Sequence, residues 1–154
     1  MLVEIFFVRH GESQANVIQH QTSCGTIKHL LMRDPILTDK GEFQSRACAE
    51  DMPLVDIVLC SELLRAIQTA LAMCPDRFVH VVPYLNELGT GLDNLPHDKE
   101  TQQEILGKDF HRVLYEEGKV EDSFMKFIVK HILPRFKSKQ HVKVALFTHS
   151  RLMR

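Results

Sequence analysis

The chain has 154 residues, of which 44% are hydrophobic and 25% charged, with seven Gly and six Pro. This composition is typical of one globular domain and excludes a fibrous, collagen-like or disordered chain. Lys and Arg number 19 against 20 Asp and Glu, which gives a formal net charge of -1 at pH 7. Because no overall positive field exists to attract them, we expect neither nucleic acid nor a membrane as a partner.

The start of the chain and its cysteines bear on where the protein resides. Residues 1–8 are mostly apolar but include Glu4 and follow no basic leader, so they match neither a signal peptide nor a membrane span. We expect a buried strand there. The cysteines form no CxxC pair and lie mostly in apolar patterns, which favours reduced thiols in the core and a cytoplasmic protein. They are Cys24, Cys48, Cys60 and Cys74.

The nine histidines do not have the spacing of a metal site. They form no HxH or HExxH pattern, and His80 and His141 occupy the polar phase of strand-like runs, where surface positions are expected. We therefore expect no metal and no other cofactor.

The predicted elements alternate between strands and helices. Runs rich in β-branched and aromatic residues predict buried strands over residues 2–8, 55–60, 78–82 and 142–148. Apolar periodicity predicts helices over 38–52, 61–74 and 123–136, with Thr38 and Ser61 placed as N-caps. Residues 88–101, with two Gly, one Pro and many polar side chains, predict an irregular loop that is able to cover a site.

This alternation predicts the α/β class. We expect a mostly parallel sheet flanked by helices on both faces, in a single domain spanning residues 1–154. In open parallel sheets ligands bind beyond the carboxyl ends of the strands, so the residues that follow each predicted strand are site candidates. They are Arg9 and His10 after the first strand, Ser61 and Arg65 after the second, Glu87 after the third, and Thr148, His149 and Ser150 at the end of the fourth.

These residue types favour a phosphoryl site. Arginine offers a fixed fork of donors that matches phosphate oxygens, and a helix beginning near Ser61 offers free backbone N–H groups. A neutral imidazole is a competent nucleophile near pH 7, so His10 or His149 could accept a phosphoryl group. Glu87 would then protonate the departing oxygen.

Each candidate alone has a simpler interpretation. Arg65 alone fits a solvated helix residue, Glu87 an exposed loop carboxylate and His149 the cap of a strand. Ser13 and Asn16 fit ordinary helix-start residues, since both side chains can bond to free N–H groups there. The joint placement of the candidates after successive strands favours the functional interpretation.

The motifs resemble those of the histidine phosphatase superfamily, which includes the cofactor-dependent phosphoglycerate mutases. VRHGES at residues 8–13 with Asn16 resembles the signature around the phosphorylated histidine, and LTDKGE at 37–42 resembles the LTxxG segment. SELLRAIQTA at 61–70 is similar to the SxLxRAxQTA segment, LNE at 85–87 to the LxE acid, and FTH at 147–149 to the end of the second histidine's strand. Together these segments are highly specific; any one of them is weak.

The resemblance implies a phosphoglycerate mutase-like fold and a role for each matching residue. It implies that His10 is the nucleophile, that Arg9, Arg65 and His149 bind the transferred phosphoryl group, and that Glu87 is the proton donor. Ser13 and Asn16 match positions that often touch the phosphate or the substrate. It implies no metal, because positive side chains would neutralise the charge.

The chain departs from the family pattern in two places. Thr148 and Ser150 flank His149 where the family usually has glycine, and Ser150 could donate a hydrogen bond to the phosphate. The chain also ends at Arg154, five residues after His149, where the family continues into a helix. A native short form completed by self-association, a truncated sequence and a damaged copy each fit this end; we expect truncation, with a homo-oligomer as one alternative.

The function expected from these residues is hydrolysis of a small phosphate ester through a phosphohistidine on His10. Mutase-type phosphoryl transfer is the nearest alternative, although it normally requires more enclosing chain. A catalytically silent phosphate-binding or interaction domain is the second. We expect substrate specificity to lie in residues 24–35 and 88–101, with Lys28, Arg33, Asp93 and His97 as polar candidates that could equally be solvated.

Overall fold

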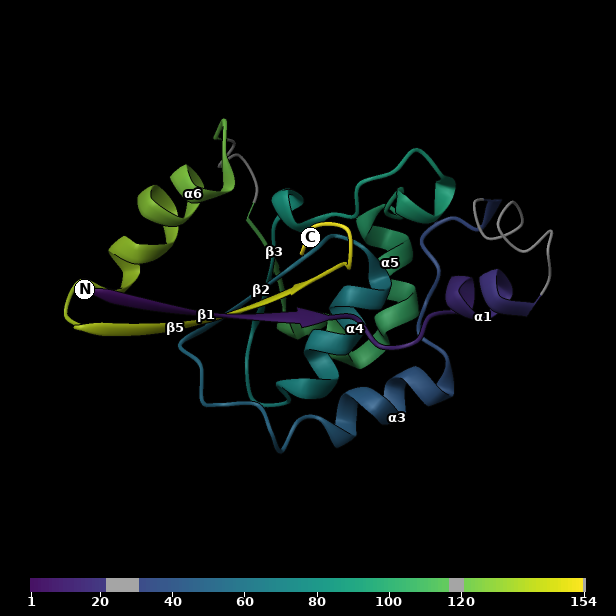
Figure 1. Cartoon of the computed structure of the whole chain (residues 1–154), viewed down its shortest axis with the longest axis horizontal. Coiled ribbons are helices and arrows are strands. Elements are labelled where there is room, and N and C mark those ends of the chain that lie inside the picture. Colours follow the sequence, from purple (N-terminus) through teal and green to yellow (C-terminus); the bar gives the residue numbers. More distant parts are fainter. Residues whose placement is uncertain (22–30, 117–120, 154) are drawn as a thin grey trace.

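The computed structural model describes residues 1–21, 31–116 and 121–153 (Figure 1). One sheet of parallel strands in the order β1-β5-β2-β3-β4 forms its centre. The strands are β1 (Leu2–Arg9), β2 (Ile57–Cys60), β3 (Val79–Val81), β4 (Val113–Tyr115) and β5 (His141–Thr148). The four predicted strands are confirmed within two residues at each end. The expected burial of β1 is wrong, because β1 is the edge strand and leaves Leu2 and Phe7 exposed. β4 is an additional strand that was not predicted from the sequence.

The register of the strands brings their carboxyl ends to one edge. β1 pairs with β5 from Leu2 opposite His141 to Arg9 opposite Thr148, and Cys60 at the end of β2 lies opposite Phe147. The pairing continues one residue further, since the His10 N–H donates to the Thr148 carbonyl at 3.2 Å and the Ser61 N–H to the Phe147 carbonyl at 3.0 Å. The candidate residues after β1, β2 and β5 therefore share that edge.

Helices fill the connections between the strands. They are α1 (Gln14–Gln21), α3 (Asp39–Ala47), α4 (Leu64–Met73), α5 (Lys99–Leu106) and α6 (Phe124–Phe127), the last continuing as a π-turn (Ile128–Ile132) and a 3-10 turn (Leu133–Phe136). Further 3-10 turns cover Pro83–Leu85, Leu92–Asn94 and Gly107–Arg112. The predicted irregular loop over 88–101 is thus correct as far as Asp98, after which α5 begins.

The helix starts confirm one predicted cap and correct another. Thr38 caps α3 by accepting the Gly41 N–H at 3.0 Å. Ser61 does not cap α4, because the helix begins only at Leu64 and the buried carboxylate of Asp34 accepts the Leu64 N–H at 2.8 Å. Asp34 is far from Leu64 in the sequence, so the sequence of α4 and its neighbouring residues does not predict this cap.

Both faces of the sheet are covered, as expected for this class. Alternate side chains of the strands, such as Val58 and Phe147, pack under α4 in one core cluster. The side chains on the opposite face of the strands, such as Leu59 and Val144, pack with Phe127 and the turns that follow α6 in a second cluster. In Figure 1, α3, α4 and α5 lie on one side of the sheet and α6 on the other.

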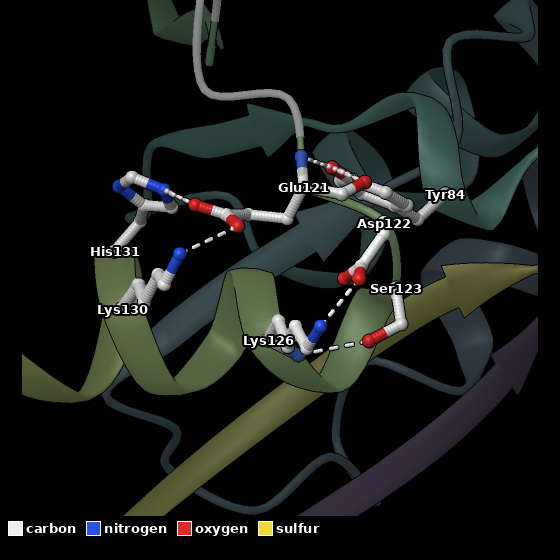
Figure 2. A network of polar contacts seen from close by, with 7 residues as sticks. All are labelled: Tyr84, Glu121, Asp122, Ser123, Lys126, Lys130 and His131. Atoms are coloured by element: carbon white, nitrogen blue, oxygen red, sulfur yellow. Dashed lines mark hydrogen bonds and ion pairs between the residues drawn. The ribbon is translucent and has the colours of Figure 1, made fainter.

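A polar network joins the start of α6 to the end of β3 (Figure 2). The Glu121 carboxylate binds Lys130 Nζ and His131 Nε2, each at 2.9 Å, and the Tyr84 hydroxyl donates to the Glu121 carbonyl at 2.9 Å. Ser123 caps α6 by accepting the Lys126 N–H at 3.3 Å. These bonds hold α6 against the turn at Pro83–Leu85, just before Asn86 and Glu87.

The cysteines and histidines outside the site mostly follow the expectation. Cys60 and Cys74 are free and buried, and burial raises the pKa of both thiols, that of Cys74 to about 11, which makes them unreactive. Cys48, in contrast, is exposed at the end of α3 rather than in the core, and Cys24 lies outside the described residues. His141 is exposed, whereas His80 is half-buried with Nδ1 2.7 Å from Glu116. No helix in the part of the chain that the structure describes is long and apolar enough to cross a membrane.

Candidate active site

A cavity of about 430 Å³ opens at the carboxyl edge of the sheet. The candidates that line it come from the ends of β1, β3 and β5 and from α1 and α4. They are Arg9, His10, Ser13, Asn16, Arg65, Glu87 and Ser150. His149 does not line the cavity: it is fully buried behind His10, with the two ring centroids 5.1 Å apart. The fold thus places seven of the candidates on the cavity wall and His149 directly behind it, whereas Ser61 and Thr148 do not line the cavity.

The ring of His10 is held in one neutral tautomer. Its Nδ1 lies 2.7 Å from the Gly11 carbonyl, and since a carbonyl only accepts, Nδ1 carries the proton. In the neutral ring the lone pair is then on Nε2. Burial, followed by the positive charges of Arg65 and Arg9, lowers the pKa of His10 to about 4. The imidazole is therefore neutral at pH 7.

Hydrogen bonds fix the proton of His149 as well. The Ser61 hydroxyl donates its one hydrogen to Asn86 Oδ1 at 2.9 Å, so it can only accept from His149 Nε2, also at 2.9 Å. Asn86 is oriented by the neighbouring Glu62, whose N–H donates to Oδ1 and whose carboxylate accepts from Nδ2. The proton of His149 thus resides on Nε2.

The other ring nitrogen of His149 is an unsatisfied acceptor. Nδ1 is buried and has no hydrogen-bond partner among the residues described. Burial, the charge of Arg65 and the neighbouring His10 hold the pKa of His149 far below its usual value, at about 2. A proton on Nδ1 would therefore require a compensating negative charge nearby.

Arg65 provides a buried positive charge. It is only 4% exposed, and its two terminal nitrogens donate to the Asp93 carbonyl at 2.7 Å and to Asn94 Oδ1 at 3.0 Å. Burial lowers the pKa of Arg65, but a guanidinium keeps its proton in proteins. Both acceptors are neutral oxygens, and the nearby carboxylates of Asp34, Asp93 and Glu87 partly offset the effect of burial on this pKa.

The loop that carries His10 is held by α4 and α3. The Gly11 N–H donates to the Thr69 hydroxyl at 3.0 Å, and Thr69 donates in turn to the Arg65 carbonyl at 2.7 Å. On the other side, Gly41 contacts the loop so closely that a Cβ on it would lie 2.0 Å from the Glu12 carbonyl oxygen. The LTDKG segment therefore packs directly against the loop that carries His10.

The remaining candidates differ in how their side chains are used. Arg9 is exposed on the cavity wall, and Glu87 is half-buried, with its carboxylate accepting the Leu88 N–H at 3.2 Å. Ser13 is buried, and both its N–H and its hydroxyl donate to Asn16 Oδ1 at 3.0 Å. Ser13 and Asn16 thus start α1, as their simpler interpretation expected, while also lining the cavity.

The motifs that meet at this edge agree with a family comparison. The family model described as histidine phosphatase superfamily (branch 1) matches residues 5–154. The chain belongs to this superfamily. Adenosylcobalamin/alpha-ribazole phosphatase of Escherichia coli K12 is 32% identical over 106 residues, which cover 66% of this chain and 48% of that protein. The chain thus spans about half the length of this curated relative.

Solved structures of the superfamily share the fold. The alpha-ribazole phosphatase from Shigella flexneri is 27% identical with a TM-score of 0.54, over 97% of this chain and 75% of that one. A putative alpha-ribazole-5'-P phosphatase from Escherichia coli (24%) and a phosphoserine phosphatase from Entamoeba histolytica (21%) each have a TM-score of 0.55 over 99% of this chain and 76% of theirs. The predicted phosphoglycerate mutase-like fold is confirmed.

The residues that replace the family's glycines have defined places. The Thr148 hydroxyl donates to the Leu85 carbonyl at 2.8 Å, which ties the end of β5 to the segment that carries Glu87. Ser150 is half-buried on the cavity wall. Thr148 therefore braces the end of β5 without lining the cavity, whereas Ser150 lines it.

Of the residues predicted to determine substrate specificity, the structure places only some at the cavity. Asp93 is buried on the cavity wall, whereas Arg33 and His97 do not line it; Arg33 donates instead to the Pro96 carbonyl at 2.9 Å. Lys28 lies outside the described residues. Within the described ranges, no cluster of three or more His, Cys, Asp or Glu is arranged to hold a metal ion.

Three parts of the site were not predicted from the sequence. Asp34 caps α4 and also accepts the His97 N–H at 2.9 Å, which joins the helix of Arg65 to the loop over the cavity. Asn86 orients Ser61, and Arg151 lines the cavity two residues after His149. Of these only Arg151 carried a signal, since it follows the same strand as His149.

Proposed function

We propose that this protein is a phosphomonoester hydrolase that acts on a small phosphate ester through a phosphohistidine on His10. The observation that carries the proposal is the hydrogen bond from His10 Nδ1 to the Gly11 carbonyl at 2.7 Å. It leaves a lone pair on Nε2 in a cavity that Arg9 and Arg65 also line. Its phosphatase relatives in the superfamily support the same reaction class.

In the first step, His10 Nε2 attacks phosphorus and the ester P–O bond breaks. Arg9 and Arg65 bind the phosphoryl oxygens where negative charge is concentrated in the transition state. The carboxylic acid form of Glu87 gives its proton to the departing alkoxide, so a neutral alcohol leaves. The products of this half-reaction are the alcohol, the phosphohistidine and the Glu87 carboxylate.

In the second step, water attacks the phosphohistidine. The Glu87 carboxylate takes a proton from the water, the P–N bond breaks, and inorganic phosphate leaves with His10 and Glu87 restored. When the dianion binds, a proton from solvent moves onto Nδ1 of His149, close behind His10 and without a partner among the described residues, and it returns to solvent when phosphate leaves.

The test is a rapid-quench incubation with 4-nitrophenyl phosphate, followed by intact-mass analysis and peptide mapping. A phosphoryl group is expected on His10, and none on the His10→Ala variant. His111→Ala is the matched control, because exposed His111 also has Nδ1 on a carbonyl, that of Lys108 at 2.6 Å, but does not line the cavity. Phosphate release that persists in His10→Ala contradicts the proposal.

Two further measurements separate the alternatives. Phosphate binding that survives His10→Ala, with no turnover in either protein, indicates the silent binding domain. Isomer exchange with a monophosphoglycerate indicates a mutase. Because the arginines supply the positive charge, EDTA is expected to leave the rate unchanged; a rate lost in EDTA and restored by Mg²⁺ contradicts metal independence.

A further inference from the structure

The cavity contains a basic side chain that the proposed reaction does not use. Arg9, Arg65 and Arg151 all line it, and the first two suffice to bind the transferred phosphoryl group. Arg151 belongs to the turn that follows β5, past His149 and Ser150. The cavity is of about 430 Å³, within the range of pockets that enclose a whole small molecule, so it has room for a leaving group beside the phosphoryl group.

The guanidinium of Arg151 is positioned at the rim of the cavity. Its NH1 donates to the Leu88 carbonyl at 3.0 Å, which is the one hydrogen-bond acceptor of Arg151 among residues 1–21, 31–116 and 121–153. A Cβ added to Gly89 would lie 3.5 Å from the same nitrogen, so the glycine leaves the guanidinium uncovered there. The Leu88 carbonyl accepts from one of the five N–H donors of the guanidinium and does not neutralise its charge.

We infer that the substrate carries a second anionic group, a carboxylate or a second phosphate, and that Arg151 binds it. The inference rests on the proposed phosphatase function and adds the class of substrate. A guanidinium presents a planar fork that matches both groups and binds either of them by two charge-assisted hydrogen bonds. The bond to Leu88 holds the side chain beside the segment of Glu87, where the leaving group departs.

The test compares three substrates that share one three-carbon skeleton. Glycerol 3-phosphate has a neutral remote group, 3-phosphoglycerate a carboxylate and glycerol 1,3-bisphosphate a second phosphate. Steady-state rates are measured on the wild type, Arg151→Gln and Arg151→Lys. Arg77→Gln is the control, because Arg77 is an exposed arginine that does not line the cavity.

Arg151→Gln is expected to raise KM for the substrates with a remote charge by about 10- to 100-fold, the cost of a lost charged hydrogen bond, with kcat nearly unchanged. KM for glycerol 3-phosphate stays within about twofold, and Arg151→Lys restores part of the loss because it keeps the charge but not the fork. The substrate with the lowest KM identifies the group. An equal rise for all three substrates, or no rise for any, overturns the inference.

A binding measurement keeps this inference separate from the phosphatase proposal. Calorimetry on His10→Ala with the same three compounds needs no turnover, and adding Arg151→Gln to it is expected to abolish the preference for a second charge. Charge-dependent binding without any turnover would refute the phosphatase alone. Turnover without a charge preference would refute the role of Arg151 alone.

Discussion

Two cavities of this protein differ in how their basic side chains are held. The larger one, of about 530 Å³, lies between α3, α4 and α5, where Arg46 is paired with Glu42, and Arg112 with Asp109 at 3.1 Å. In the smaller cavity, Arg65 and Arg151 are held by carbonyl and amide oxygens. The difference lies in the direct partners, since Arg112 also donates to backbone carbonyls but, of these four arginines and among the described residues, only those of the larger cavity are hydrogen-bonded to a carboxylate. The residues that line a cavity, and not its volume, therefore distinguish the candidate active site.

Replacing a carboxylate in each cavity is expected to give the largest difference in hydrolysis rate between the two cavities. Glu87→Gln is expected to slow hydrolysis of alkyl phosphates by about 10²- to 10⁴-fold, because their alkoxide leaves only with a proton. The same variant slows 4-nitrophenyl phosphate by less than about tenfold, since that leaving group needs no proton. Glu42→Gln in the larger cavity is the control. Single-turnover rates that fall equally for both substrates would argue against Glu87 as the acid.

Replacing an arginine in each cavity is expected to give the next largest difference, in kcat. Arg65→Ala is expected to lower kcat by about 10²- to 10³-fold, because it removes a preorganised donor from the developing charge. Arg46→Ala is expected to leave kcat within about twofold, because its partner Glu42 and the solvent already compensate its charge. Circular dichroism confirms that each variant is folded. Wild-type turnover in Arg65→Ala would remove this residue from the site.

Gly41 links the two regions, since α3 lines the larger cavity and supports the His10 loop. Gly41→Ala would place a Cβ 2.0 Å from the Glu12 carbonyl oxygen, so the backbone must move. We expect a loss of about 1 to 3 kcal/mol in the free energy of unfolding and a lower kcat. Phe43→Ala, on the exposed face of the same helix, is expected to change stability by less than about 0.5 kcal/mol. Urea denaturation of both variants measures the difference.

The histidine pair gives the smallest expected effect, on the pH dependence of stability. The pKa of His10 is about 4 in the folded protein and near 6.5 when unfolded, so unfolding takes up a proton between these values. Its contribution is fully present above pH 6.5 and is lost as the pH falls toward 4. Between pH 5 and 6 the slope for His10→Gln is expected to be smaller by about 1.4 kcal/mol per pH unit. Equal slopes would contradict a neutral buried His10.

Parts of the fold were visible in the sequence because they depend on local patterns. The strands β1, β2, β3 and β5 are short runs rich in β-branched and aromatic residues, and the Thr38 cap precedes α3 directly. β4 is only three residues long, with an exposed Leu114, so its pattern is too short to distinguish from a loop. α5 begins within a polar stretch rich in turn residues, which concealed its capping residue Asp98.

The sequence by itself determined the α/β class, the phosphoryl-type residues after successive strands and the superfamily motifs, since each is a property of neighbouring residues. Only the tertiary structure decided that His149 lies behind His10 and off the cavity wall, that Asp34 rather than Ser61 caps α4, and that Arg151 shares the cavity. A hydrogen bond between distant segments also fixed the proton position of His149, through Ser61. Such contacts depend on which segments the sheet brings together, and no local periodicity encodes them.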